Sequence, residues 1–233
     1  MILIFFIGTI FGSFFAVLAK RIPINECFTT ERSKCDHCQT TLNWLDLFPF
    51  YVLLFHKNNC RYCQQAIHNY HSIFEILTGI TFLIFYTHFP ISWNYFYLLL
   101  LWLMGLTLSL TDYLYYLVEP KIMYSLSCFA LISFFITHGF SLHYFISTAF
   151  ILILFLLLSL YLPKSIGGGD IKLLLIWSIF LNILDLLWLL LIASLTGIIF
   201  IVLAQLLFKK KLIKLPFVPF LTFALFLVTL IFY

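Results

Sequence analysis

Two aspartates, Asp112 and Asp170, stand at the ends of apolar segments in a chain of which only 9% of the residues are charged. An ionised aspartate at the centre of a bilayer costs about 2.5 to 3.5 kcal/mol, and less toward the interface, so an acid at membrane depth is a candidate functional residue. Two carboxylates that meet can share one proton. One then acts as a base toward water while the other acts as an acid toward a carbonyl. The pair predicts a catalytic site that activates water.

Three glycines precede the second acid, in the run Gly167-Gly168-Gly169-Asp170. Residues without a Cβ let the backbone take positive φ and let another chain approach closely. A peptide must be extended to be cut, because the carbonyls of a helix are enclosed and hydrogen-bonded. We therefore expect all three glycines to contact a peptide substrate. The alternatives are structural: a flexible turn at the glycines, a helix N-cap at Asp170 and a headgroup-level residue at Asp112.

Four cysteines form two CxxC motifs, 35–38 and 60–63, with 21 residues between them. Four thiolates in paired motifs can bind Zn²⁺ tetrahedrally, and a polar segment of about fifty residues needs such a crosslink to fold. This spacing slightly exceeds the usual 15 to 20 residues, a difference that a longer loop absorbs. Disulfides and unrelated buried cysteines are the alternatives, but a reducing cytoplasm disfavours disulfides. The predicted ligands of a structural Zn²⁺, or of another tetrahedral thiolate metal, are Cys35, Cys38, Cys60 and Cys63.

The elements that must position these residues are apolar. The chain is 64% hydrophobic and 20% aromatic, and its mean hydropathy is +1.10, whereas soluble domains carry about 25% charged residues. Apolar stretches of about 17 to 22 residues match about 30 Å of hydrocarbon at a helical rise of 1.5 Å per residue. The sequence therefore predicts an all-α polytopic membrane protein with about eight transmembrane helices. The expected spans are roughly 2–19, 72–89, 94–111, 121–137, 143–162, 171–184, 186–207 and 215–232.

The sixth and seventh spans are separated only by Asn182 and Asp185. A continuous helix over 171–207 would be about 55 Å long, too long for one crossing. We therefore expect a turn near Asp185. The first span is expected to remain a transmembrane helix, because no basic region precedes it as in a signal peptide.

The basic residues orient the chain. With the N-terminus outside, the inside segments 20–71, 112–120, 163–170 and 208–214, with their flanks, carry all thirteen Lys and Arg. This matches the excess of positive charge on the cytoplasmic side of membrane proteins. The net charge of +4 is therefore a topological signal and does not indicate nucleic-acid binding. The expected domains are a first transmembrane helix at 1–19, a cytoplasmic cysteine-rich domain at 20–71 and a seven-helix membrane domain at 72–233.

With these features together, the chain resembles the bacterial type IV prepilin peptidases, a leader peptidase/N-methyltransferase family of membrane aspartic proteases of the GxGD type. Asp112 matches the family's first catalytic aspartate, and Gly167-x-Gly169-Asp170 matches the second. The chain has Val118-Glu119-Pro120 where many members have Leu-Pro-Asp. Further matches lie at Gly12-Ser13-Phe14, Arg21, Pro23, Arg32-Ser33-Lys34-Cys35, Leu42, Trp44, Asp46-Leu47, Pro49, Cys60-Arg61-Tyr62-Cys63 and Glu75.

The resemblance implies a multi-pass protein of the bacterial cell membrane whose cysteine domain and active site face the cytoplasm. It implies cleavage of the short basic leader of prepilins or pseudopilins after a glycine, with these proteins and the lipid bilayer as partners. Many members also N-methylate the new amino terminus with S-adenosylmethionine. Asp112 and Asp170 would jointly activate water, with no covalent acyl-enzyme.

Two functions from other classes also fit parts of the sequence. A membrane thiol-disulfide oxidoreductase would use the two CxxC pairs, but the charge pattern puts these on the reducing side and leaves Asp170 without a role. A transporter or channel could use intramembrane acids and a broken helix. Neither aspartate lies in the middle of a span, however, and no internal repeat is evident.

Overall fold

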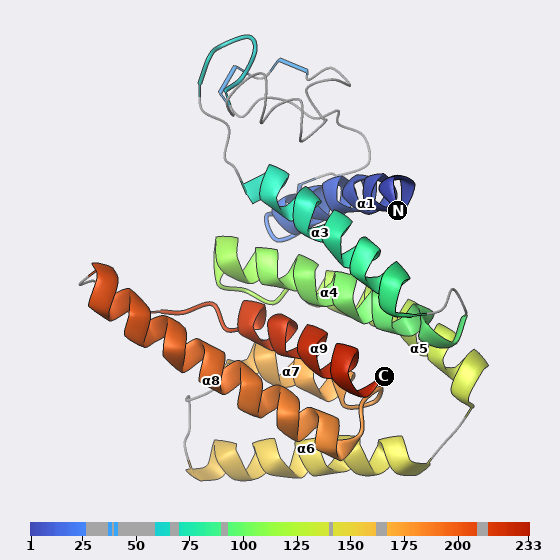
Figure 1. Cartoon of the computed structure of the whole chain (residues 1–233). Helices are drawn as coiled ribbons and strands as arrows, with labels where there is room; N and C mark the ends of the chain where they lie inside the picture. Colours follow the sequence, from blue (N-terminus) through green and yellow to red (C-terminus); the bar gives the residue numbers. More distant parts are fainter. Residues whose placement is uncertain are drawn as a thin grey trace. The chain divides into compact units, whose positions relative to one another are not determined.

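The computed structural model describes residues 1–26, 37–38, 40–41, 59–65, 70–89, 93–139, 142–161, 167–208 and 214–233. This part of the chain is helical and forms eight α-helices (Figure 1), which confirms the predicted all-α class and the helix count. The helices are α1 (Ile2–Arg21), α3 (Tyr70–His88), α4 (Trp93–Tyr115), α5 (Pro120–His138), α6 (Leu142–Tyr161), α7 (Gly168–Trp177), α8 (Ile183–Phe208) and α9 (Val218–Phe232).

Four of these helices are long and apolar enough to cross a bilayer: Ile2–Arg21, Tyr95–Tyr115, Pro120–His138 and Ile183–Leu207. The apolar parts of α6 and α9 are shorter, at Ile146–Leu158 and Val218–Phe232. Helix α7 differs most from the prediction, because its 10 residues are only about 15 Å long at 1.5 Å per residue. The sixth predicted span is therefore a short helix followed by a turn.

The predicted break between the sixth and seventh spans is confirmed, but it lies at residues 178–182, before Asp185. Asp185 stabilises the break from the first turn of α8. Its Oδ2 accepts hydrogen bonds from the backbone N–H of Asn182 (3.4 Å), from the Asn182 side-chain amide (3.2 Å) and from the Tyr233 hydroxyl (3.2 Å). A carboxylate that reaches back to the preceding N–H is typical of a helix start. Asp185 is thus a structural acid.

The chain separates into two compact units, Met1–Thr87 and His88–Tyr233. In the first, α1 and α3 approach closely at small residues. A Cβ on Gly12 would collide with the Thr78 hydroxyl and lie 2.9 Å from the Glu75 Cα, so this crossing needs glycine at position 12. Glu75 is buried on α3 and accepts a hydrogen bond from Ser13 of α1.

In the second unit, α4 is the central helix and packs against both α5 and α9, while α8 packs against α9 (Figure 1). Trp102 lies fully buried in the middle of α4, and its Nε1 donates a hydrogen bond of 2.9 Å to the Thr229 Oγ1 of α9. Two turns further along α4, the hydroxyls of Ser109 and Thr222 are 2.8 Å apart. As positions advance along α4, their partners move back along α9. The two helices are therefore antiparallel, and these polar pairs set their register.

Candidate active site

Asp112 lies in the last turns of α4 and is buried. Its carboxylate Oδ2 accepts a hydrogen bond of 3.0 Å from the backbone N–H of Val218, the first residue of α9. This contact continues the antiparallel α4–α9 register. The start of α9 therefore lies at the same end of the unit as the end of α4, as the predicted topology requires.

Helix α9 begins here because of its sequence, Pro216-Phe217-Val218-Pro219. Proline is favoured in the first turn of a helix, where its missing N–H would have no intrahelical partner. The N-cap residue, Phe217, supplies no side-chain cap. The carboxylate of Asp112, 106 positions away along the chain, takes the place of the usual capping side chain.

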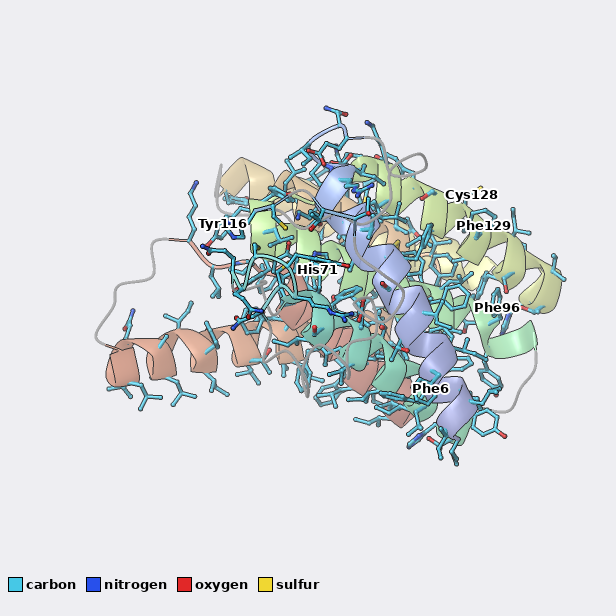
Figure 2. The ribbon with its side chains drawn as sticks, turned by 90° about the horizontal axis from the view of Figure 1, so that it is seen from above. Phe6, His71, Phe96, Tyr116, Cys128 and Phe129 are labelled. Carbon is cyan, nitrogen blue, oxygen red and sulfur yellow. The ribbon has the colours of Figure 1, made fainter. Side chains whose placement is uncertain are left out.

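After Asp112, the chain leaves α4 abruptly. Tyr116, labelled in Figure 2, has a φ of +55°, and its N–H donates a 2.9 Å hydrogen bond to the Asp112 carbonyl. This left-handed residue closes the helix as a glycine commonly does. The next three residues connect α4 to α5, which begins at Pro120. Val118 lies in this connection.

Gly169 explains how α7 reaches the end of α4. A Cβ on Gly169 would lie 2.8 Å from both the Cβ and the Cγ2 of Val118, closer than real Cβ contacts occur. Only glycine therefore lets the first turn of α7 rest on the α4–α5 connection. Because Asp170 is the next residue, this contact places the second acid close to the first.

The other two glycines have different surroundings. A Cβ on Gly168 would meet nothing within 4 Å, and one on Gly167 would meet the Asp170 carboxylate at 3.0 Å. None of the three glycines has positive φ: Gly167 is extended with a φ of −63°, and Gly139 is the only glycine with positive φ among the residues that the structure describes. A substrate contact at these glycines stays a prediction, and Gly168 has the most room for one.

The two carboxylates interact. Asp170 precedes the predicted apolar span 171–184, in the first turn of α7. Burial, and secondly the negative charge of Asp112, raise the pKa of Asp170 to about 6. Two acids that share a site cannot both ionise easily, so the pair retains one proton up to about pH 6. The structure thus brings together the two acids that the sequence singled out.

Three of the four predicted metal ligands lie in the described part of the chain. The sulfurs of Cys38, Cys60 and Cys63 are all within 4.8 Å of one another, and those of Cys38 and Cys60 are 3.9 Å apart. Two Zn–S bonds of about 2.3 Å at a tetrahedral angle put their sulfurs about 3.8 Å apart, whereas a disulfide needs about 2.05 Å. The donor set therefore fits a tetrahedral metal. The fourth predicted ligand, Cys35, lies outside the described residues.

Two backbone hydrogen bonds close the turn that carries Cys60 and Cys63. The Cys60 N–H donates to the Gln65 carbonyl (2.8 Å), and the Gln64 N–H donates to the Cys60 carbonyl (2.9 Å). Gln64 has a φ of +57°.

Cys128, in contrast, is exposed on the surface of α5 beside Phe129 (Figure 2), far along the sequence from both motifs.

Comparison with known proteins identifies the family. Residues 97–202, which hold both aspartates, match the Type IV leader peptidase family, and residues 6–89 match the Bacterial Peptidase A24 N-terminal domain. The chain belongs to the type IV leader peptidase family. The two matched regions follow the division of the structure into two units.

Several curated relatives of this leader peptidase family carry the name "Prepilin leader peptidase/N-methyltransferase". The protein of Bacillus subtilis strain 168 is 28% identical over 52% of this chain and 49% of its own length. The protein of Myxococcus xanthus strain DK1622 is 30% identical over 40% of this chain and 28% of its own length. That of Klebsiella pneumoniae is 35% identical over 35% of this chain and 38% of its own length. The chain thus spans about half, or less, of the length of these relatives.

No solved structure gives a significant match to the chain. The family matches do not favour the thiol-disulfide oxidoreductase. One feature of the site was missed from the sequence, namely the start of α9 against Asp112. The two prolines at positions 216 and 219 are the signal that could have predicted a helix N-terminus there.

Proposed function

We propose that this leader peptidase is a membrane-embedded aspartic endopeptidase with Asp112 and Asp170 as its catalytic pair. It removes the short basic leader of prepilins or pseudopilins, after a glycine and at the cytoplasmic face of the membrane. The observation that supports this most is the convergence of the two acids, which lie 58 positions apart in the sequence and interact electrostatically across α4 and α7. The relatives' names give the substrate class.

The chemistry requires one proton on the pair. The ionised carboxylate takes a proton from water as the water oxygen attacks the scissile carbonyl carbon, and the protonated carboxyl gives its proton to the carbonyl oxygen. The resulting tetrahedral diol collapses when the C–N bond breaks. The departing amine takes a proton from the acid that became protonated in the first step, and the other carboxylate takes the proton of a diol hydroxyl as the carbonyl forms again. The pair ends with one proton, as it began.

The substrate reaches this depth for the reason that orients the enzyme. A basic leader stays in the cytoplasm while the following apolar segment enters the bilayer. The bond between them therefore lies at the headgroup level, at the end of α4. The open position beside Gly168 is where we place the extended residues of the leader.

The metal has a structural role in this proposal. Cys35, Cys38, Cys60 and Cys63 would hold a Zn²⁺ that stabilises the cytoplasmic segment and takes no part in hydrolysis. N-methylation with S-adenosylmethionine would follow from the relatives' names. The sequence has no glycine-rich nucleotide loop that locates this donor.

Co-expression with a prepilin-like substrate tests the proposal. Mass spectrometry of the substrate should show loss of the leader with the new terminus directly after a glycine, and the same spectrum reads any methylation. The Asp112→Asn and Asp170→Asn variants should leave the substrate intact. Asp185→Asn is the matched control, because it removes an acid that is as buried as Asp112 and lies in the first turn of α8, and it should cleave normally. An intact substrate with the unmodified enzyme, inserted in the same membrane, would overturn the proposal.

A further inference from the structure

The two acids of the pair have unequal surroundings. Asp112 accepts a hydrogen bond from the Val218 N–H at the start of α9, and the backbone of Phe217 also hydrogen-bonds to it. Asp170 also lies in the first turn of a helix, but it makes no side-chain cap there, and no described residue donates to its carboxylate. A hydrogen bond from a helix N-terminus stabilises the charged form of an acid. The pair is therefore asymmetric before any substrate binds.

The donor is positioned independently of the acids. Helix α9 is held against α4 by the Ser109–Thr222 and Trp102–Thr229 hydrogen bonds, and Gly105 lets Thr222 approach within van der Waals contact of α4. These pairs lie along the helices, away from the site. The N-terminus of α9 thus reaches Asp112 because of helix packing, and it need not follow the charge of the acid. A preset donor costs no reorganisation when the reaction begins.

We propose that Val218, through its backbone N–H, is a positioning residue that holds Asp112 as the ionised member of the pair, so that Asp112 is the base and Asp170 is the acid. Asp112 takes the proton from the attacking water, and Asp170 gives its proton to the carbonyl oxygen. This assignment rests on the proposed function. Because α9 directs its N-terminus at Asp112 alone, the roles are fixed by the fold and do not exchange at the first step.

Other titratable groups near the pair must be separated from this effect. Asp170 is the charged group that interacts electrostatically with Asp112. Among the described residues, α9 itself carries no acid, base or tyrosine before Tyr233. The other carboxyl groups of this unit are the buried Glu119, in the α4–α5 connection, and the buried Asp185, in the first turn of α8. The others on neighbouring segments are Tyr113, Tyr115, Tyr116, Lys121, Tyr124, Cys128, His138, Lys172 and Lys214.

Deleting the donor without deleting the helix is possible at position 218. Val218 is the first residue of α9, so its N–H makes no intrahelical bond, and Val218→Pro removes that N–H alone. Proline disfavours the αR conformation of the preceding residue, and Phe217 has φ −94° and ψ −26°. A second variant therefore replaces the Val218 residue by its α-hydroxy acid, which substitutes an ester for the amide and keeps the side chain. Val218→Ala is the control, because it keeps the N–H and shortens the side chain.

The measurement is the pH dependence of kcat for cleavage of a prepilin-like peptide by the purified full chain. We expect the acid limb to move to higher pH by about one unit in the proline and ester variants, with about a tenfold lower rate on that limb. The midpoint of the acid limb should not move in Val218→Ala, although shortening this fully buried side chain lowers the rate. Glu119→Gln should retain the acid limb, which excludes Glu119 as its source.

An active ester variant with an unmoved acid limb would overturn the inference, and so would loss of activity at every pH in both variants that lack the Val218 N–H. A limb that disappears in Glu119→Gln would also contradict it. These outcomes are distinct from failure of the proposed function, which would show as cleavage by Asp112→Asn or Asp170→Asn.

Discussion

Gly169 lies so close to Val118 that no side chain fits between them: a Cβ added to the glycine would lie 2.8 Å from two side-chain carbons of the valine. The contact joins the first turn of α7 to the connection between α4 and α5. Asp170 follows Gly169 directly, and Asp112 lies six positions before Val118. The distance between the two acids therefore depends on the absence of a side chain at position 169.

Gly169→Ala should consequently reduce cleavage at least tenfold, because an overpacked contact costs about 1 to 3 kcal/mol and displaces Asp170. Gly168→Ala is the matched control for folding, since its Cβ meets open space, and it should leave thermal stability unchanged. Adding Val118→Gly to Gly169→Ala should restore part of the activity. A fully active Gly169→Ala enzyme would show that the contact does not position the acid.

The Gly169–Val118 contact is one of the features that the sequence could not predict. Spans, helix class and both acids follow from apolar run lengths and charge placement, because membranes impose simple constraints on length and sign. The reason for Gly169 does not follow, because its neighbour Val118 is 51 positions away and glycine has several uses. The short α7 was also missed, since an apolar run does not reveal where a helix breaks inside it.

The role of α9 could not be predicted from the sequence either. The hydrogen bond between Val218 and Asp112 uses a backbone atom, so the identity of residue 218 carries no signal. Only the flanking prolines indicate where the helix begins. The packing of α4 against α9 brings the start of α9 to Asp112, and this packing depends on pairs such as Ser109 and Thr222. Nothing in the sequence marks these two residues as partners.

Cleavage should depend on pH in a bell shape. Asp170 must carry a proton to act as the acid, and burial together with the Asp112 charge raises its pKa to about 6. The rate should therefore fall as pH rises through the upper constant, when this proton is lost, and fall at acidic pH, when Asp112 is also protonated. The midpoints belong to the pair as macroscopic constants. A rate profile that is flat between about pH 4 and pH 9 would contradict a shared proton.

The cysteine cluster should bind about one metal ion per chain in tetrahedral thiolate coordination. Elemental analysis of the purified protein checks the stoichiometry, and a thiol titration before and after chelation checks the ligands. Cys60→Ser should lose the metal and the thermal stability that it confers, because Cys60 is fully buried among the sulfurs. Cys128→Ser, which removes an exposed cysteine on α5, should keep both. A metal-free protein with all its thiols titratable would rule the site out.

The α4–α9 register should control activity from a distance. Ser109→Ala removes the hydrogen bond to Thr222 and loosens the helix that carries Val218. We expect a loss of thermal stability of about 0.5 to 1.5 kcal/mol and a lower kcat with little change in KM. Ser194→Ala, which removes a hydroxyl bonded only within α8, serves as the control. Equal effects of the two substitutions on kcat would show that the α4–α9 register does not control activity.

The central claim is that Asp112 and Asp170 act as one catalytic unit on one water. The most direct test compares the cleavage rates of Asp112→Asn, Asp170→Asn and the double variant, each confirmed to be inserted in the membrane at equal amounts. Residues that act as a unit are not additive, so all three variants should fall to the same background rate. Substantial turnover by either single variant, or a double variant clearly slower than both, would contradict the claim.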